Sequence, residues 1–137
     1  MSKITHKPGK RKTAVARTTI REGKGEIRIN KIPLKLIKPK AKRMRIEECL
    51  MIASPYVDLD KIDIKINVRG GGVMGQADAI ASSISRALVE FSGSDDLLHE
   101  YLNYDRTLIA GDHRLTEVHK PSQSSKGPRH KRQKSYR

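Results

Sequence analysis

The chain has 137 residues, the length of one domain, and 36% of them are hydrophobic, which suffices for one core. Its single cysteine excludes a disulfide framework, and its five scattered histidines give no metal-ligand spacing, so neither a metal nor a cofactor is expected. No apolar run approaches the roughly 20 residues that cross a bilayer, and the first residues lack the apolar stretch of a secretory signal, which predicts a cytoplasmic protein without a membrane partner.

Charge is distributed unevenly along the chain, whose formal net charge is +14. Residues 1–45 have a net charge of +14, residues 46–112 of −7, and residues 113–137 of +7. An acidic centre between two basic ends differs from the even mixture of a surface that only keeps a protein soluble, and it indicates a polyanionic partner. The sequence thus predicts a basic arm at 1–12, a globular domain at 13–112 and an extended basic tail from there to the end.

The first strands are predicted next to the basic arm. The arm is expected to be irregular, and its Lys10, Arg11 and Lys12 are candidate RNA contacts. Residues 13–21 and 26–30 alternate apolar or β-branched residues with polar ones, and the glycine-containing turn between them predicts a β-hairpin.

A helix is predicted over residues 39–53, because Pro39 suits a first turn and another proline follows the end. Four basic residues crowd its start, namely Lys40, Lys42, Arg43 and Arg45. Their positive charges oppose the helix dipole, and a bound anion would offset that cost. The first three are therefore candidate RNA contacts.

The centre of the chain predicts a strand followed by two helices. Residues 61–69 alternate cleanly between apolar and polar, as in a half-buried strand. Apolar residues recur at helical spacing from about residue 76 to Phe91, and Ser94 is placed to cap a third helix that ends near Arg106. Together with the first strands, these elements predict an α+β fold in which helices cover one mixed sheet.

A glycine loop, Gly70-Gly71-Gly72, joins this strand to the long helix, and Gly75 completes the spacing of the dinucleotide-binding fingerprint. Backbone amides without side chains at a helix start can hold a phosphate. A small nucleotide-binding enzyme is the alternative function, but the acidic residue that should end a second parallel strand is missing, and the chain is too short for a doubly wound sheet. Two interpretations stay open for the loop and the adjacent Arg69: a structural turn, or a turn that also contacts RNA phosphate.

No group of residues has the spacing of a catalytic site, so the chain is not expected to be an enzyme. Asp112, His113 and Arg114 could suggest acid–base chemistry, but no nucleophile accompanies them. A salt-bridged structure or an RNA contact is the expected role of this triplet, with Arg114 as the candidate RNA contact.

The last twenty residues contain seven basic residues and no acidic one. Extended, they could span roughly 65 Å and thread between RNA helices; a tail that only aids solubility is the alternative. The five aromatic residues of the chain do not suffice for a base-stacking platform, so recognition by backbone shape and charge is expected. The candidate rRNA contacts of the tail are Lys120, Lys126, Arg129, Lys131, Arg132 and Lys134.

Residues 70–88 are similar to the signature of the family of small-subunit ribosomal protein nine: three glycines, then a glutamine, then small residues that lead to Arg86-Ala87-Leu88. The resemblance extends from about Gly9 to the last residue. Further matches are the segments 9–14, 104–108 and 133–137. The last two of these segments resemble the archaeal or eukaryotic form.

The resemblance implies a fold of the ribosomal protein S5 domain 2-like type, with a left-handed β-α-β crossover where the general rule predicts a right-handed one. The same fold occurs in small-molecule kinases whose glycine loop binds ATP. The family also implies a structural protein in the head of the small subunit, bound to small-subunit rRNA and neighbouring ribosomal proteins and not forming homo-oligomers. Its tail would reach P-site tRNA, where Arg137 would contact phosphate. Tyr136 replaces a basic residue of the bacterial pattern.

Overall fold

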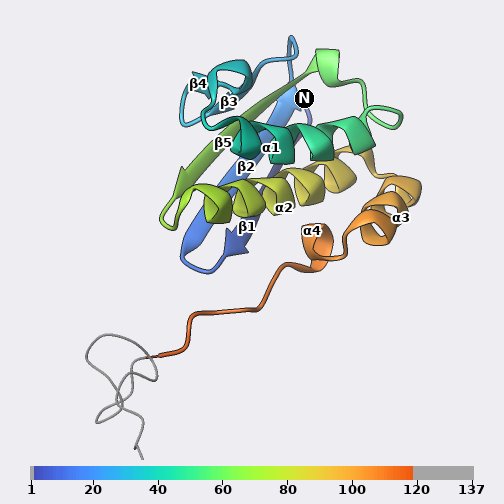
Figure 1. Ribbon diagram of the computed structural model, residues 1–137. Helices are drawn as coiled ribbons and strands as arrows, with labels where there is room; N and C mark the ends of the chain where they lie inside the picture. Colours follow the sequence, from blue (N-terminus) through green and yellow to red (C-terminus); the bar gives the residue numbers. More distant parts are fainter. Residues whose placement is uncertain (1, 119–137) are drawn as a thin grey trace, which may run out of the picture.

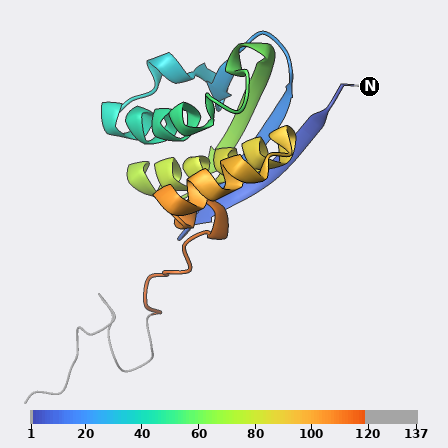
Figure 2. The ribbon, with the colours of Figure 1, turned by 90° about the vertical axis from the view of Figure 1, so that its right-hand side faces the viewer.

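The computed structural model describes residues 2–118, which form one five-stranded sheet with the helices packed on one of its faces (Figures 1 and 2). The strands are β1 Ile4–Arg11, β2 Ala14–Glu22, β3 Ile27–Ile29, β4 Ile32–Pro33 and β5 Ile62–Arg69. The helices are α1 Lys40–Ala53, α2 Val73–Ser92, α3 Asp95–Tyr104 and α4 Thr107–Ala110, with 3-10 turns η1 Leu34–Leu36 and η2 Leu59–Lys61. None of these helices is long and apolar enough to cross a membrane.

The sheet is mixed, with the strand order β1-β2-β5-β3-β4. β2 is antiparallel to both β1 and β5, whereas β3 is parallel to β5 and is joined to it through α1. In Figure 1, α1 lies in front of the sheet, and when β3 and β5 are turned to point upward, β5 lies to the left of β3. The crossover is therefore left-handed, and the α+β architecture is that of the ribosomal protein S5 domain 2-like type.

The irregular structure predicted for residues 1–12 is wrong, because most of this segment forms β1, which pairs with β2 along its whole length. The inner face of β1 carries Thr5 and Gly9, and both are buried. A Cβ atom at Gly9 would overlap the backbone of α2. Since the buried positions hold threonine and glycine and one of the exposed positions holds Ile4, no hydrophobic alternation marks this strand in the sequence.

The predicted hairpin of residues 13–21 and 26–30 is also wrong, because β5 lies between β2 and β3. The predicted turn between β2 and β3 exists, but a side chain of β5 holds it in place. Asp63 of β5 accepts hydrogen bonds from the backbone amides of Lys24 at 2.9 Å and Glu26 at 3.1 Å. A strand from far along the chain thus takes the place that the second half of a hairpin would occupy.

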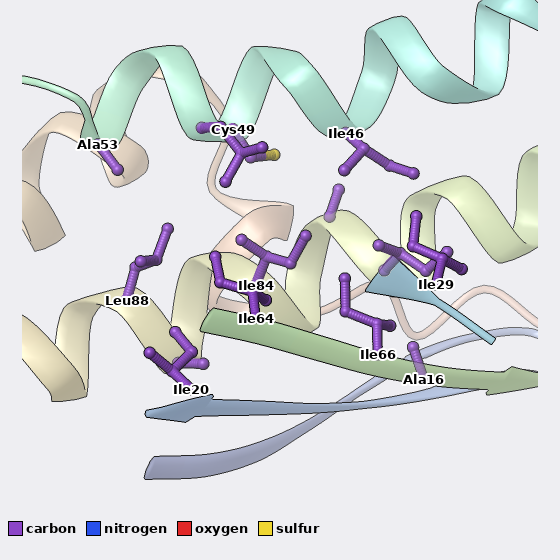
Figure 3. Packing of buried hydrophobic residues seen from close by; sticks show 14 of the residues in the cluster. Ala16, Ile20, Ile29, Ile46, Cys49, Ala53, Ile64, Ile66, Ile84 and Leu88 are labelled. Atoms are coloured by element: carbon purple, nitrogen blue, oxygen red, sulfur yellow. The ribbon is translucent and has the colours of Figure 1, made fainter. Parts of the chain in front are cut away.

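The core lies between the inner face of the sheet and helices α1 and α2 (Figure 3). Ile64 and Ile66 of β5 are buried on the face that the alternation predicted, and Ile84 of α2 packs with them. Tyr101 of α3 is also buried, and its hydroxyl donates a hydrogen bond to the carbonyl oxygen of Cys49 at 2.7 Å. This contact fastens α3 to α1 at the end of the molecule opposite the glycine loop.

The helices lie close to their predicted places. α1 begins and ends as expected, and α2 begins at Val73, slightly earlier than expected, because Gly72 already has the extended backbone of an N-cap. The third predicted helix is divided in two. α3 ends at Tyr104, and Asp105 then accepts hydrogen bonds from the amide and the hydroxyl of Thr107, which starts α4.

Candidate nucleic-acid interface

The starts of α1 and α2 lie side by side, next to the glycine loop (Figure 1). Lys42 Nζ donates a hydrogen bond to Gln76 Oε1 at 2.9 Å, and Gln76 Nε2 donates one to the carbonyl oxygen of Gly70 at 3.1 Å. Partial burial lowers the pKa of Lys42. The fold thus brings together two sets of predicted contacts that are about thirty residues apart in the sequence: the basic start of α1 and the glycine loop.

Neither helix start is neutralised by a negative side chain. The first turns of α1 and α2 contain no acidic residue, and neither Pro39 nor Gly72 provides a side-chain cap for the amides that follow it. Two positive helix ends and the exposed Lys40 therefore act at one place. Arg43, another predicted contact, already donates a hydrogen bond to the carbonyl oxygen of Lys35 at 3.0 Å. This arrangement can hold an anion such as phosphate.

Gly70 and Gly71 form a turn that favours glycine, with φ values of +75° and +67°. A Cβ atom at Gly70 would lie 2.5 Å from the carbonyl oxygen of Thr13, and one at Gly71 would lie 2.8 Å from Ala14 Cβ. Gly72 has open space around its Cβ position. The structural interpretation of the loop is therefore confirmed at two of its three glycines, and the contact with phosphate stays a prediction.

The sheet face opposite the helices is open to solvent and predominantly basic. Arg17 of β2 lies opposite Asn67 of β5, and Arg28 of β3 lies opposite Lys65. Arg17, Asn67 and Arg69 line a hollow of about 570 Å³ that reaches the glycine loop. Of these basic residues, Arg69 was predicted from the sequence, whereas the other three were missed, although they lie on the polar side of the strand patterns that identified the buried side.

The turn between β1 and β2 adds Lys12 to this region. Lys12 is exposed, and its neighbour Thr13 lies against Gly70. Lys12, the glycine loop and the basic end of the sheet therefore form one continuous surface, which we call the loop surface. It consists of Lys12, Arg17, Lys40, Lys42, Arg69 and residues 70–72.

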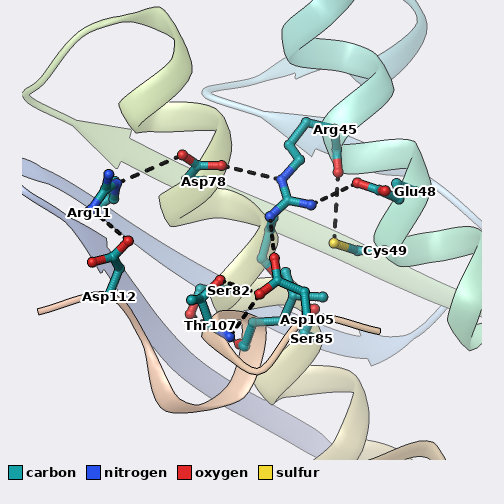
Figure 4. Close-up of polar contacts among 12 residues, drawn as sticks. Arg11, Arg45, Glu48, Cys49, Asp78, Ser82, Ser85, Asp105, Thr107 and Asp112 are labelled. Atoms are coloured by element: carbon teal, nitrogen blue, oxygen red, sulfur yellow. Dashed lines mark hydrogen bonds and ion pairs between the residues drawn. The ribbon is translucent and has the colours of Figure 1, made fainter. Parts of the chain in front are cut away.

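Arg11 and Arg114 both contact Asp112, where the chain leaves the folded domain. Arg11 Nη1 lies 2.7 Å from Asp112 Oδ2 (Figure 4), and Arg114 Nη2 lies 2.6 Å from the same oxygen. The hydrogen bonds from Arg114 hold the pKa of Asp112 well below its ordinary value. The side chain of Arg11 is only 16% exposed, whereas that of Arg114 is 71% exposed. Arg11 thus has a structural role, and Arg114 keeps a face open to a partner.

A basic hollow of about 750 Å³ lies beside this ion pair. Its basic lining residues are Lys10, Arg86, Arg106 and Arg114. Lys10 is only two residues from Lys12 of the loop surface. The basic hollow and the loop surface are therefore neighbours at the end of β1.

A second ion-pair cluster joins three helical segments (Figure 4). Arg45 of α1 contacts Glu48 at 2.7 Å, Asp78 of α2 at 3.2 Å, and Asp105 at 3.0 Å. No partner of Arg45 was predicted from the sequence, because two of its three carboxylates come from distant segments. The cluster holds the helices together, and its carboxylates already occupy the guanidinium group.

The described residues support neither a metal site nor the nucleotide fingerprint. Within residues 2–118, no group of three or more His, Cys, Asp or Glu residues could hold a metal ion. After α2 the chain continues into α3 and α4, so the second parallel strand that the fingerprint requires does not follow within that part of the chain. The predicted tail contacts that lie outside the described residues are Lys120, Lys126, Arg129, Lys131, Arg132, Lys134 and Arg137.

Comparison with known proteins gives matches over nearly the whole chain. The family model described as ribosomal protein S9/S16 matches residues 9–137. Similar proteins named small ribosomal subunit protein uS9 occur in two strains of Methanococcus maripaludis, at 53% and 52% identity, and in Methanococcus vannielii, at 50% identity. Each comparison covers 135 residues, 98% of this chain and 99% of the relative. The match spans both the folded domain and the basic tail, and the chain belongs to the ribosomal protein S9/S16 family.

Proposed function

We propose that the chain is a structural protein of the small ribosomal subunit, that it binds small-subunit rRNA in the head, and that it supports cytoplasmic translation without catalysing a reaction. The observation that carries this proposal is the similarity, over nearly the full length of both chains, to proteins named small ribosomal subunit protein uS9. The loop surface supplies the physical basis, because it combines exposed cations with helix ends that attract anions.

Two kinds of donor on the loop surface suit RNA phosphate. The amides that follow Gly72 can approach a phosphate closely, because this residue has no side chain. Around them, the cations of Arg17, Lys40 and Arg69 attract the RNA backbone over a longer range. Such contacts position RNA by its backbone and not by its base edges, which agrees with the small number of aromatic residues.

The contacts among Lys42, Gln76 and Gly70 prepare this surface for binding. Because the two hydrogen bonds at 2.9 Å and 3.1 Å already connect both helix starts, the loop does not have to be ordered by the RNA. Less conformational entropy is then lost on association. The proposed anchor is therefore a rigid site within the folded domain.

The basic tail is proposed to continue this binding from the domain to P-site tRNA. Its first basic residue, Arg114, borders the basic hollow, and the ion pair between Arg11 and Asp112 fixes the place where the tail begins. Along the tail, Lys120 to Lys134 would contact rRNA and Arg137 would contact tRNA phosphate. Neighbouring ribosomal proteins of the head are the other proposed partners, and a homo-oligomer is not part of the proposal.

The salt dependence of binding tests the role of the loop surface. We would measure the affinity of the purified chain for a transcript of the small-subunit head over a series of salt concentrations. Arg69→Ala removes one cation at the loop end of β5 and should reduce the slope of log affinity against log salt by about 0.7–0.9. Lys61→Ala is the matched control, because this lysine is exposed and directly precedes the opposite end of β5. Equal slopes for both variants would contradict the proposal.

A further inference from the structure

Five acidic residues lie on helices α1 and α3. Glu47 and Glu48 belong to α1, and Asp95, Asp96 and Glu100 belong to α3. The second half of α1 and the neighbouring α3 lie at the end of the helical layer opposite the loop surface (Figure 1). The molecule therefore has a basic end that suits RNA and an acidic end that does not.

This acidic end also exposes large apolar side chains. We call this end, together with Met44 about one turn before it on α1, the α1–α3 face, and it consists of Met44, Glu47, Met51, Tyr56, Asp96 and Glu100. Met44 and Met51 are 55% and 74% exposed, and they lie two helical turns apart on α1, bordering one shallow hollow. Both side chains are flexible and suit an adaptable contact. Burying them against a partner would gain free energy that the isolated chain does not have.

The carboxylates of Asp96 and Glu100 on α3 lie near one of these apolar residues, Tyr56. Tyr56 follows α1, and desolvation together with the nearby carboxylates of Glu100 and Asp96 raises its pKa. Within residues 2–118, neither of these two carboxylates takes part in an ion pair, and Arg45 of α1 already contacts three other carboxylates. The C-terminal end of α1 adds the negative end of its helix dipole. The face is thus negative as well as apolar.

We infer that the α1–α3 face docks a basic segment of another protein of the small subunit, one that carries an apolar side chain between lysines or arginines. RNA does not fit, because its phosphates would meet unpaired carboxylates. A lysine-bearing protein segment complements both properties, since its cations pair with Asp96 and Glu100 while its apolar side chain covers Met51. This inference rests on the proposed function, because the neighbour is a component of the same particle.

Zero-length cross-linking of carboxylates to amines, applied to small subunits purified from cells that make this chain, tests the inference directly. We expect Glu47, Asp96 or Glu100 to be joined to a lysine of another small-subunit protein. The double variant Asp96→Lys and Glu100→Lys should then be retained about tenfold less well in salt-washed subunits. The double variant Glu22→Lys and Asp60→Lys is the matched control, because it changes the net charge equally at exposed positions away from the face.

The outcomes separate this inference from the proposed function. Equal retention of the two double variants would overturn the inference, and so would cross-links from the face only to lysines of this chain's own tail. A photochemical cross-link between Tyr56 and rRNA would also overturn it, by showing that RNA covers the face. In each of these cases the wild-type chain is still found in the subunit, so the proposed function stands. Absence of the wild-type chain from the subunit would overturn both.

Discussion

Arg11 Nη1 and Asp112 Oδ2 lie 2.7 Å apart, so the end of β1 is fastened to the residue that directly precedes the basic tail. Both side chains are mostly covered, with 16% and 12% of their areas exposed. Lys10 to Lys12 and the start of the basic tail, which are a hundred residues apart in the sequence, therefore lie at one place on the folded domain. Any RNA that contacts Lys10 or Lys12 also lies close to the beginning of the tail.

Replacing Arg45 by methionine should lower the free energy of unfolding at neutral pH by about 1–3 kcal/mol. The change leaves three carboxylates close together without their cation, and the loss is smaller than for a fully buried pair because the Arg45 side chain is 21% exposed. Urea unfolding at pH 7 measures the effect. Arg28→Met is the control, because this arginine is exposed and, among residues 2–118, pairs only with Glu26 on the surface; an equal loss in both variants would contradict the role of the cluster.

The same cluster predicts how stability changes with pH. Burial disfavours the charged form of Asp105, but hydrogen bonds from Thr107 and Arg45 outweigh it, so the pKa of Asp105 is lowered. A carboxylate with a lowered pKa stabilises the fold above its unfolded pKa of about 3.9, and this contribution is lost as the pH falls through the folded pKa. The wild type should therefore lose stability below about pH 4 more steeply than Arg45→Met does, as unfolding at a series of pH values would show.

Gly71→Ala should destabilise the folded domain by about 1–3 kcal/mol, because the new Cβ atom would meet Ala14 Cβ at 2.8 Å and the backbone has φ +67°. Gly72→Ala is the control, since its φ is −92° and its Cβ position is open. Thermal unfolding of both variants measures the difference. Unchanged stability of Gly71→Ala would show that the loop does not require glycine there.

Tyr101→Phe should cost about 1–2 kcal/mol of stability. It removes the buried hydroxyl that donates to the Cys49 carbonyl at 2.7 Å, and that carbonyl oxygen loses its partner from α3. Tyr104→Phe, at a position that is 55% exposed, is the matched control and should change stability little. Chemical denaturation distinguishes the two, and equal midpoints would refute the importance of the contact.

Deleting residues 135–137 should leave the melting temperature of the isolated chain unchanged while it weakens tRNA binding in the P site of assembled subunits. The proposed contact of Arg137 with tRNA phosphate is electrostatic, so the loss should be larger at low salt than at high salt. Filter binding of tRNA to subunits that contain the wild-type or the shortened chain measures it. Equal tRNA affinity of the two kinds of subunit would contradict the proposed contact of Arg137 with tRNA.

The sequence predicted those elements whose apolar residues follow a regular period. The alternation in residues 61–69 gave the buried face of β5, and the helical spacing gave the inner face of α2. It failed for β1, where Thr5 and Gly9 take the buried positions, because neither is a large apolar residue. It also failed for the pairing of β2 with β3, since the intervening strand comes from more than thirty residues further along the chain.

The candidate site was predicted in the same uneven way. Clusters of basic residues and the glycine loop were visible in the sequence, and the fold brings Lys42 to Gln76 beside that loop. Arg17 and Lys65 were missed because single basic residues that alternate with buried ones look like an ordinary solvent face. The partners of Arg45 could not be predicted, because two of them are brought to it only by the packing of the helices.

β1 is the outermost strand of the sheet, and its backbone is poorly suited to accept another strand. Pro8 has no amide hydrogen, and its carbonyl oxygen already accepts a hydrogen bond from Arg86 at 3.2 Å. Lysines along the same strand repel a second copy. A newly made chain that has not yet met its RNA is thereby protected against edge-to-edge aggregation through this strand.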